Sequence, residues 1–230
     1  LLNRLKEQAA EMCNAGKETI TFRNEKVFAG ETETQTGWEE LVVSAYKNRV
    51  CLSQTGHYAT PVIHFDKTSE KGNPFAYHVF GTAAVTVTLD CLRGRHRVDS
   101  VQIVHDFGTD MNYDINIGQV EGAVVQGIGW MTTEEIRFSE KGKLLSDSLS
   151  TYKVPDIFSV PKVLECRALQ AEGPEMAIMR SKAIGEPPFM YGIGAYFALL
   201  NAIRAFNPRY KPDFNSPMTP EKVLMALYRQ

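Results

Sequence analysis

Glu186 has the setting that points most directly to chemistry, because it lies between Gly185 and the prolines Pro187 and Pro188. An apolar run follows, and the prolines predict that a helix opens there. The free N–H groups and the positive dipole end of a helix favour an ionised carboxylate at this position. Such a carboxylate, held in an apolar neighbourhood, can serve as a general base. The alternative is that Glu186 only caps its helix, which the local pattern by itself favours because acidic residues are common in first turns.

A second polar residue, Gln119, stands at the start of another predicted helix, directly after Gly118. A glutamine amide donates and accepts hydrogen bonds at once, which suits the polar groups of a cofactor. Glycines at 118, 122 and 127 would let a backbone or a ligand come close. For Gly122 and Gly127, tight packing between helices is the alternative.

The spacing of histidines and acidic residues does not indicate a metal site. The histidines form neither an HxH nor an HExxH pattern, so we expect strand residues with local hydrogen bonds. They are His57, His64, His78, His96 and His105. Asp106 and Asp110 flank Gly108 without the regular spacing of a calcium loop, so we expect them to shape a turn. We therefore predict no protein ligands for a metal ion.

The cysteines and the common catalytic motifs narrow the choice of function further. The cysteines stand too far apart for a CxxC pair, and free thiols in a reducing cytoplasm are favoured over two disulfides. They are Cys13, Cys51, Cys91 and Cys166. The absence of P-loop, GxSxG and Rossmann glycine patterns leaves nucleotide hydrolysis, acyl transfer and direct dinucleotide binding without support.

The charge balance argues against nucleic acid or a membrane surface as a partner. The chain has 25 Lys and Arg against 27 Asp and Glu, with no block of like charge. The apolar run from Phe189 to Leu200 is interrupted by Tyr191 and two glycines, and we expect it to be too short to span a membrane. The chain begins with neither an initiator Met nor a signal sequence, so we expect a piece of something longer with a cytoplasmic location.

The N-terminal elements that the pattern predicts are two helices around an irregular stretch. Apolar residues at helical spacing predict a helix over Leu1–Ala15, with Gly16 placed to stop it. Residues 17–36 predict a short strand and an exposed loop. A second helix is predicted over Trp38–Asn48, and its buried side is expected to hold Leu41, Val42, Ala45 and Tyr46.

A β-hairpin is the clearest element of the middle of the chain. Residues 52–65 predict two short strands that meet at Pro61, and residues 72–74 predict a turn. Apolar residues then alternate strongly over Tyr77–Leu89 and again over Val98–Phe107, which predicts two antiparallel strands.

Strands and helices come in mixed order with a long antiparallel hairpin, so the predicted class is α+β, in which helices pack with that hairpin. The period changes to that of a helix over Asp114–Phe138. A strand at Val163–Leu169, a buried helix over Phe189–Phe206 and a short helix from about Thr219 follow.

Six stretches of the chain are distinctive: GNPFAY (72–77), DCL (90–92), DINIGQVEGAVVQ (114–126), STYKVP (150–155), SKAIGEPP (181–188) and SPMTPEK (216–222). Taken in this order, they resemble the molybdenum hydroxylases and, within them, the xanthine dehydrogenases. They run from about residue 36 to the C-terminus, whereas residues 16–35 depart most from the family.

The resemblance implies that residues 1–230 are the C-terminal part of the family's molybdopterin-binding domain. A lead-in helix and loop would cover 1–36, and the family-like core would cover 37–230. It also implies a molybdenum-dependent hydroxylation of purines, hypoxanthine or xanthine to urate, in which Glu186 matches the base. Gln119 matches a contact to the molybdenum centre or its pterin, and Gly118 and Gly185 would be further cofactor contacts.

The double proline after Glu186 resembles xanthine dehydrogenases more than aldehyde oxidases, which tend to carry small, flexible residues there. Hydroxylation of aldehydes or N-heterocycles is the alternative activity, and a non-catalytic scaffold module is the alternative of another class. In the family, the other substrate residues, the 2Fe–2S clusters and FAD lie upstream. We therefore expect this chain to be inactive alone and to need those modules as partners, and its oligomeric state stays open, a homo-oligomer included.

Overall fold

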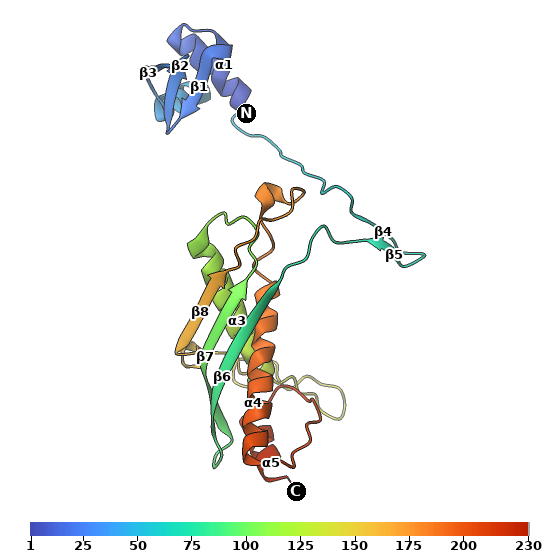
Figure 1. Cartoon of the computed structure of the whole chain (residues 1–230). Coiled ribbons are helices and arrows are strands. Elements are labelled where there is room, and N and C mark those ends of the chain that lie inside the picture. The colour runs from blue at the N-terminus through green and yellow to red at the C-terminus, as the bar shows by residue number, and fades with distance from the viewer. Residues whose placement is uncertain (230) are drawn as a thin grey trace. The chain divides into compact units, whose positions relative to one another are not determined.

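The computed structural model describes residues 1–229 and divides the chain into two compact units, Leu1–Ala59 and Thr60–Gln230 (Figure 1). Each unit has its own buried core.

The first unit packs two helices against a small antiparallel sheet. Its sheet has the order β1-β2-β3, and its core joins residues of both helices to the sheet, among them Leu5, Ile20 and Leu41. The elements are α1 (Leu2–Cys13), the 3-10 turn η1 (Lys17–Thr19), β1 (Ile20–Arg23), β2 (Lys26–Ala29), β3 (Thr32–Gly37) and α2 (Trp38–Lys47).

Three predictions for the first unit need correction. The first helix ends before Gly16 because Asn14 takes the left-handed conformation and caps it. The stretch 17–36 is not mainly a loop, because its Glu and Thr residues form the outer strand β3, where polar side chains face water. Tyr46 is 76% exposed and does not belong to the buried side of α2.

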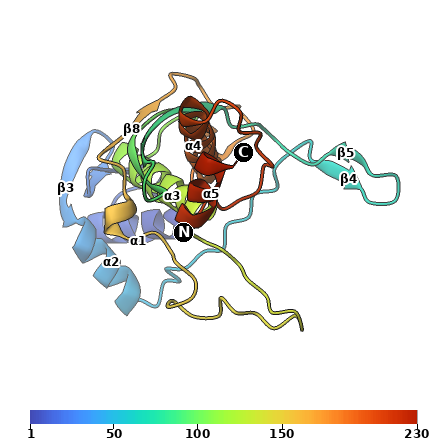
Figure 2. The same ribbon diagram turned by 90° about the horizontal axis from the view of Figure 1, so that it is seen from below.

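The second unit is built on a three-stranded sheet of order β6-β7-β8, which α3 and α4 cover on one face (Figures 1 and 2). β6 and β7 pair antiparallel from Gly81↔His105 to Asp90↔Arg95, and β8 pairs parallel to β7. The elements are β4 (His64–Asp66), β5 (Lys71–Asn73), β6 (Gly81–Asp90), β7 (Arg95–His105), α3 (Tyr113–Thr132), η2 (Ile157–Ser159), β8 (Val163–Ala168), η3 (Ile178–Arg180), η4 (Pro187–Gly192), α4 (Ile193–Phe206) and α5 (Pro220–Tyr228).

The alternation in the sequence locates the hairpin β6–β7, because β6 turns its apolar residues toward the helices and its threonines toward solvent. The predicted bounds need correction, since β6 begins at Gly81 and not at Tyr77, and β7 runs over Arg95–His105 and not over Val98–Phe107. The next helix, α3, is capped by the Asn112 side chain and ends at Thr132, before the predicted Phe138. At that end the hydroxyls of Thr132 and Thr133 donate to carbonyls one turn back. Such bonds compete with continuation of the helix.

The prediction for residues 52–65 is wrong, since no strand forms before His64. Two short strands do pair further on, as the projecting hairpin β4–β5 (Figure 1). The predicted turn at 72–74 lies largely within β5. The actual turn follows Asp66, whose carboxylate accepts hydrogen bonds from the Thr68 N–H and the Ser69 hydroxyl.

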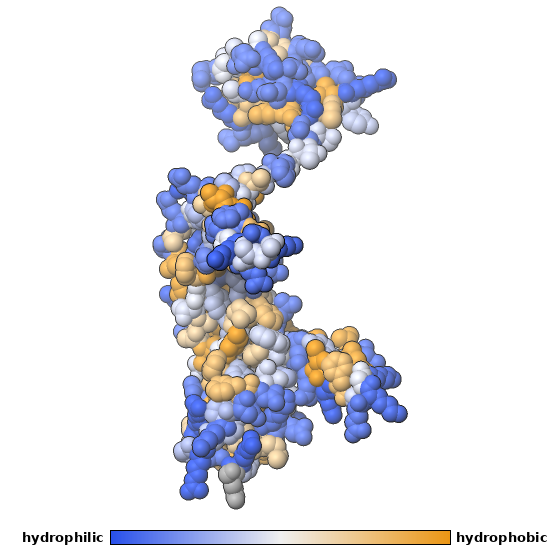
Figure 3. Space-filling model, turned by 90° about the vertical axis from the view of Figure 1, so that its right-hand side faces the viewer, coloured by the Kyte–Doolittle hydropathy of each residue, from blue (hydrophilic) through white to orange (hydrophobic). Residues whose placement is uncertain are grey.

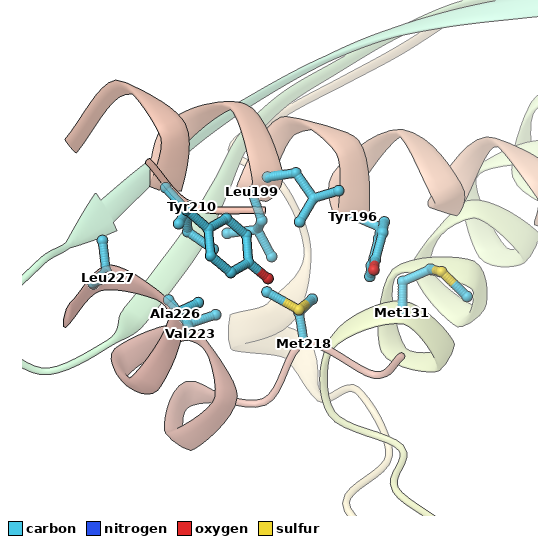
Figure 4. Close-up of a cluster of buried hydrophobic side chains, with 10 residues drawn as sticks. Met131, Tyr196, Leu199, Tyr210, Met218, Val223, Ala226 and Leu227 are labelled. Carbon is cyan, nitrogen blue, oxygen red and sulfur yellow. The ribbon is translucent and has the colours of Figure 1, made fainter. Parts of the chain in front are cut away.

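The last two helices complete the core of the second unit. Side chains of α4 and α5 point toward Met131 of α3 and toward Tyr210 and Met218 (Figure 4). α5 begins where the sequence predicted a short helix, and its cap is Thr219, whose hydroxyl accepts a hydrogen bond from the N–H of Lys222. The predicted helix from Phe189 begins as the 3-10 turn η4 and becomes α-helical only at Ile193.

The stretch Pro187–Phe206 is longer and more apolar than expected, since by length and composition alone it would suffice to cross a membrane. In the second unit, however, α4 supplies five buried residues to the core, which is typical of a central helix of a globular unit. Apolar residues also interrupt the hydrophilic surface on the face drawn in Figure 3.

Candidate active site

Glu186 lies where the chain leaves an extended loop and enters η4. Its side chain is exposed and helps to line a cavity of about 660 Å³, together with Phe75, Tyr77, Ile178 and other residues. The carboxylate forms no hydrogen bond within residues 1–229, and in particular none that would cap η4. The structure therefore does not support the capping role, and the carboxylate is available to a ligand.

Two of the predicted cofactor contacts lie next to Glu186. Oε1 of Gln119, on the exposed side of α3, lies 3.6 Å from the position that a Cβ on Gly185 would occupy. Among the described residues the Gln119 amide has no hydrogen-bond partner, so both its donor and its acceptor are open. Gly118 precedes it on α3 with nothing within 4 Å of the site where a Cβ would stand. The fold thus joins the start of α3 to the loop before η4.

A buried ion pair holds that loop. Nζ of Lys182 lies 2.5 Å from Oδ2 of Asp106 and donates to the carbonyl of His78 at 3.0 Å. Burial raises the pKa of the Asp106 carboxyl, but hydrogen bonds from Lys182 and from the Gly108 N–H outweigh this and lower the pKa below its usual range. Asp106 also shapes the turn at Gly108, as expected, while Asp110 accepts a hydrogen bond from Asn116.

Beside this pair, His105 is fully buried and its Nδ1 lies 2.6 Å from the hydroxyl of Tyr191. Burial lowers the pKa of His105, against the charge of Asp106, and the ring stays neutral near pH 7. Burial also raises the pKa of Tyr191 to about 12, so its phenol stays protonated. Nε2 of His105 has no partner in the part of the chain that the structure describes.

The described residues contain no group of three His, Cys, Asp or Glu side chains that could hold a metal ion. The cysteines are unpaired there, and burial raises the pKa of the Cys166 thiol to about 11. A reactive thiolate is not available at Cys166.

The chain matches one known protein family over more than half of its length. Residues 1–161 match the model of the molybdopterin cofactor-binding domain. The chain belongs to this family. Gln119 and Gly118 lie within the matched residues, and Glu186 lies after them.

Curated relatives agree with this assignment, and a solved structure shares the fold. Xanthine dehydrogenase/oxidase of Felis catus is 42% identical over 200 residues, which cover 84% of this chain and 15% of that protein. Aldehyde oxidase 4 of Mus musculus is 37% identical over 193 residues, covering 82% of this chain and 14% of that protein. The structure of quinoline 2-oxidoreductase from Pseudomonas putida 86 superposes with a TM-score of 0.66 at 22% identity, covering 99% of this chain and 28% of that one, and so shows a common fold. The chain spans about 15% of the length of the curated relatives that it matches.

The site fits a molybdopterin group in its donor set. A pterin offers ring nitrogens and oxygens, and Gln119 presents an unpaired amide beside a loop whose glycine, Gly185, leaves room for close approach. The sequence patterns did not indicate Lys182 and Tyr77, which hold the loop in place, or Tyr191, whose hydroxyl joins η4 to His105. Lys182 and Tyr77 lie inside the family-like stretches 181–188 and 72–77, and those stretches were the available signal.

Proposed function

We propose that this chain is the part of a xanthine dehydrogenase-type molybdenum hydroxylase that supplies the general base, Glu186. The substrate would be a purine such as hypoxanthine or xanthine. The molybdenum cofactor, when bound, would supply the two-electron oxidation. Gln119, Gly118 and Gly185 would contact it.

One observation carries the proposal. The exposed carboxylate of Glu186, which has no partner, lines a cavity of about 660 Å³. Its chain neighbour Gly185 lies beside the exposed, unpartnered amide of Gln119, about 66 residues away in the sequence. A structural glutamate in a first turn would be expected to bond to backbone N–H groups, and Glu186 does not. The arrangement leaves its oxygens free to accept a proton from a group in the cavity.

The rest of the chemistry follows from the surroundings of Glu186. Phe75 and Tyr77 offer aromatic surface in the same cavity, and a flat heterocycle packs well on such rings. Gln119 would fix the orientation of the cofactor by hydrogen bonds, which a negatively charged side chain could not give to an acceptor atom. The proton that Glu186 accepts would be released to solvent, to which its carboxylate is exposed.

The first prediction concerns Glu186→Gln in the full-length protein. Turnover of xanthine should fall by about 100-fold or more, because the amide keeps the shape of the side chain but cannot accept the proton. Molybdenum content and thermal stability should stay unchanged, since the carboxylate has no partner in the fold. Glu140→Gln is the matched control, because Glu140 is exposed and does not line the cavity.

Turnover of the Glu186→Gln enzyme within a few-fold of wild type would refute the role of base. If the full-length wild-type protein contained no molybdenum and oxidised no substrate, the non-catalytic scaffold module would be the better hypothesis.

The alternative substrate class is an aldehyde, which the similarity to aldehyde oxidase 4 favours at 37% identity. Against it stands the rigid Pro187-Pro188 pair directly after Glu186. The ratio of kcat/KM for xanthine to that for an aromatic aldehyde distinguishes the two. The 2Fe–2S and FAD modules, an upstream half of the domain and a cytoplasmic location complete the proposal for the whole enzyme.

A further inference from the structure

We propose that the buried ion pair of Asp106 and Lys182 positions Glu186, so that Lys182 is a positioning residue of the active site. This inference rests on the proposed role of Glu186 as base. It assigns a function to two charges that the proposed reaction does not otherwise use.

The pair is the central anchor of the loop that carries Glu186. The side chain of Lys182 is 9% exposed and that of Asp106 is 2% exposed. The ammonium group of Lys182 also donates to the His78 carbonyl and lies 5.6 Å from the centre of the Phe80 ring. Lys182 thereby joins the end of β7 to the segment that leads into β6.

Backbone bonds fix the same loop on both sides of Lys182. Its own N–H donates to the carbonyl of Phe107 at 2.9 Å, and the N–H of Thr109 donates to Arg180 at 2.8 Å. The next residue, Ala183, donates its N–H to the hydroxyl of Tyr77 at 3.1 Å. The chain is therefore held up to residue 183, three residues before Glu186.

Glu186 has no bond of its own that would set its direction. Its position is determined by the anchored residues before it and by η4 after it. The side chain of a general base must be held within a fraction of an ångström of its working position for efficient proton transfer. A displacement of that side chain by 1 Å can lower the rate about 100-fold. Lys182 lines the same cavity as Glu186, but its ammonium group is engaged by Asp106 and the His78 carbonyl, so the anchor is placed to act on the reaction through the backbone that carries Glu186.

A charged pair is a costly way to obtain stability alone. Buried ion pairs lose much of their attraction to desolvation, and apolar residues of similar volume often stabilise a core as well. The pair offers direction instead, because Lys182 uses two of its three donors on partners from different segments, Asp106 and His78.

The test is the double variant Asp106→Asn/Lys182→Met of the holoenzyme, which removes both charges and leaves no unpaired one. We expect folded, molybdenum-loaded enzyme with a Tm close to that of wild type. Its kcat should fall by about tenfold or more, and its KM for xanthine should stay nearly unchanged. A merely structural pair would change Tm and cofactor content, and leave the kcat of the loaded enzyme alone. Lys153→Met is the control, because it breaks the exposed pair with Asp156.

The same double change in a Glu186→Gln background separates the two claims. A positioning residue acts through Glu186, so the double change should have no further effect on kcat there. A wild-type kcat in the double variant, or an equal loss of kcat in both backgrounds, overturns the positioning role while the base assignment stands. Turnover that survives Glu186→Gln refutes the base assignment and the inference with it.

A second variant keeps the test decisive where the double variant yields no folded enzyme. Tyr77→Phe removes only the hydroxyl that binds the Ala183 N–H and keeps the ring. We expect a kcat lowered by a few-fold in the wild-type background and no effect in the Glu186→Gln background. The same loss in both backgrounds, or none in either, contradicts the inference.

Discussion

At the scale of single residues, Asp106 and His105 link the candidate site to acid stability. The hydrogen bonds to Asp106 hold its folded-state pKa below the ordinary value of 3.8, so its contribution is present above that pH and is lost as the pH falls through the lower, folded value. Burial holds the pKa of His105 below 6.5, so the unfolded chain takes up a proton first and stability declines as the pH falls below about 6.5. The two residues therefore act in separate pH windows.

We predict two steps in the stability of the second unit, one below about pH 6.5 and one below about pH 4. The variant Asp106→Asn/Lys182→Met should weaken the lower step. It should keep the upper step and enlarge it, because His105 and its contact with Tyr191 stay in place while loss of the Asp106 charge lowers the pKa of His105 further. Urea unfolding at a series of pH values, followed by tryptophan fluorescence, measures both steps. A lower step of unchanged size in the variant would show that other carboxyl groups cause it.

At the scale of elements, the packing of α3 against η4 depends on Gly127. A Cβ on Gly127 would overlap the carbonyl oxygen of Phe189 and press on the backbone of Gly192. The tight helix packing considered for this glycine is thus confirmed, whereas Gly122 faces open space on the same helix.

This contrast gives a matched pair of predictions. Gly127→Ala should destabilise the unit by about 1–3 kcal/mol, because the backbone of η4 must shift. Gly122→Ala should stabilise it by about 0.5–1 kcal/mol, because alanine is the better helix former and meets nothing. The free energy of unfolding in urea measures both changes, and equal effects at the two positions would contradict the observed packing.

The spacing of apolar residues in the sequence predicted those helices and strands that bury one face along their whole length. Alternation located β6 and β7, and helical spacing located α3. It misjudged residues 17–36 and 52–65, because strand β3 forms by pairing with β2 and the hairpin β4–β5 depends on the turn at Asp66. Strand pairing and turn formation do not appear in the sequence as a periodic pattern of apolar residues, so a search for such periodicity does not find these elements.

The candidate site was predictable only in part for a related reason. Glu186 and Gln119 stand out through their neighbours in the chain and through the family resemblance. The bonds that hold the loop join residues far apart, as between Ala183 and Tyr77, which are 106 positions apart, or Lys182 and Asp106, which are 76 apart. Only the fold reveals such pairs.

At the scale of the whole molecule, the division into two units makes a prediction about proteolysis. Residues 48–63, which lead from the first unit into the second, contain no helix or strand. The fully buried residues of the first unit's core lie before them, between Leu5 and Ala45, and Val50 and Leu52 at the start of the segment pack against that core. Backbone outside regular structure is where proteases cut folded proteins first.

Tyr58 and Tyr46 allow this to be tested within one chain. Both are exposed, at 51% and 76%, but Tyr46 lies in α2 and Tyr58 lies in the segment without regular structure. Chymotrypsin should therefore cut after Tyr58 at least about tenfold faster than after Tyr46, because the helix must open before its backbone can enter the protease. Mass spectrometry of a digestion time course gives both rates. Faster cleavage after Tyr46 would mean that α2 opens readily, and the first unit would then not hold its own core as a compact unit.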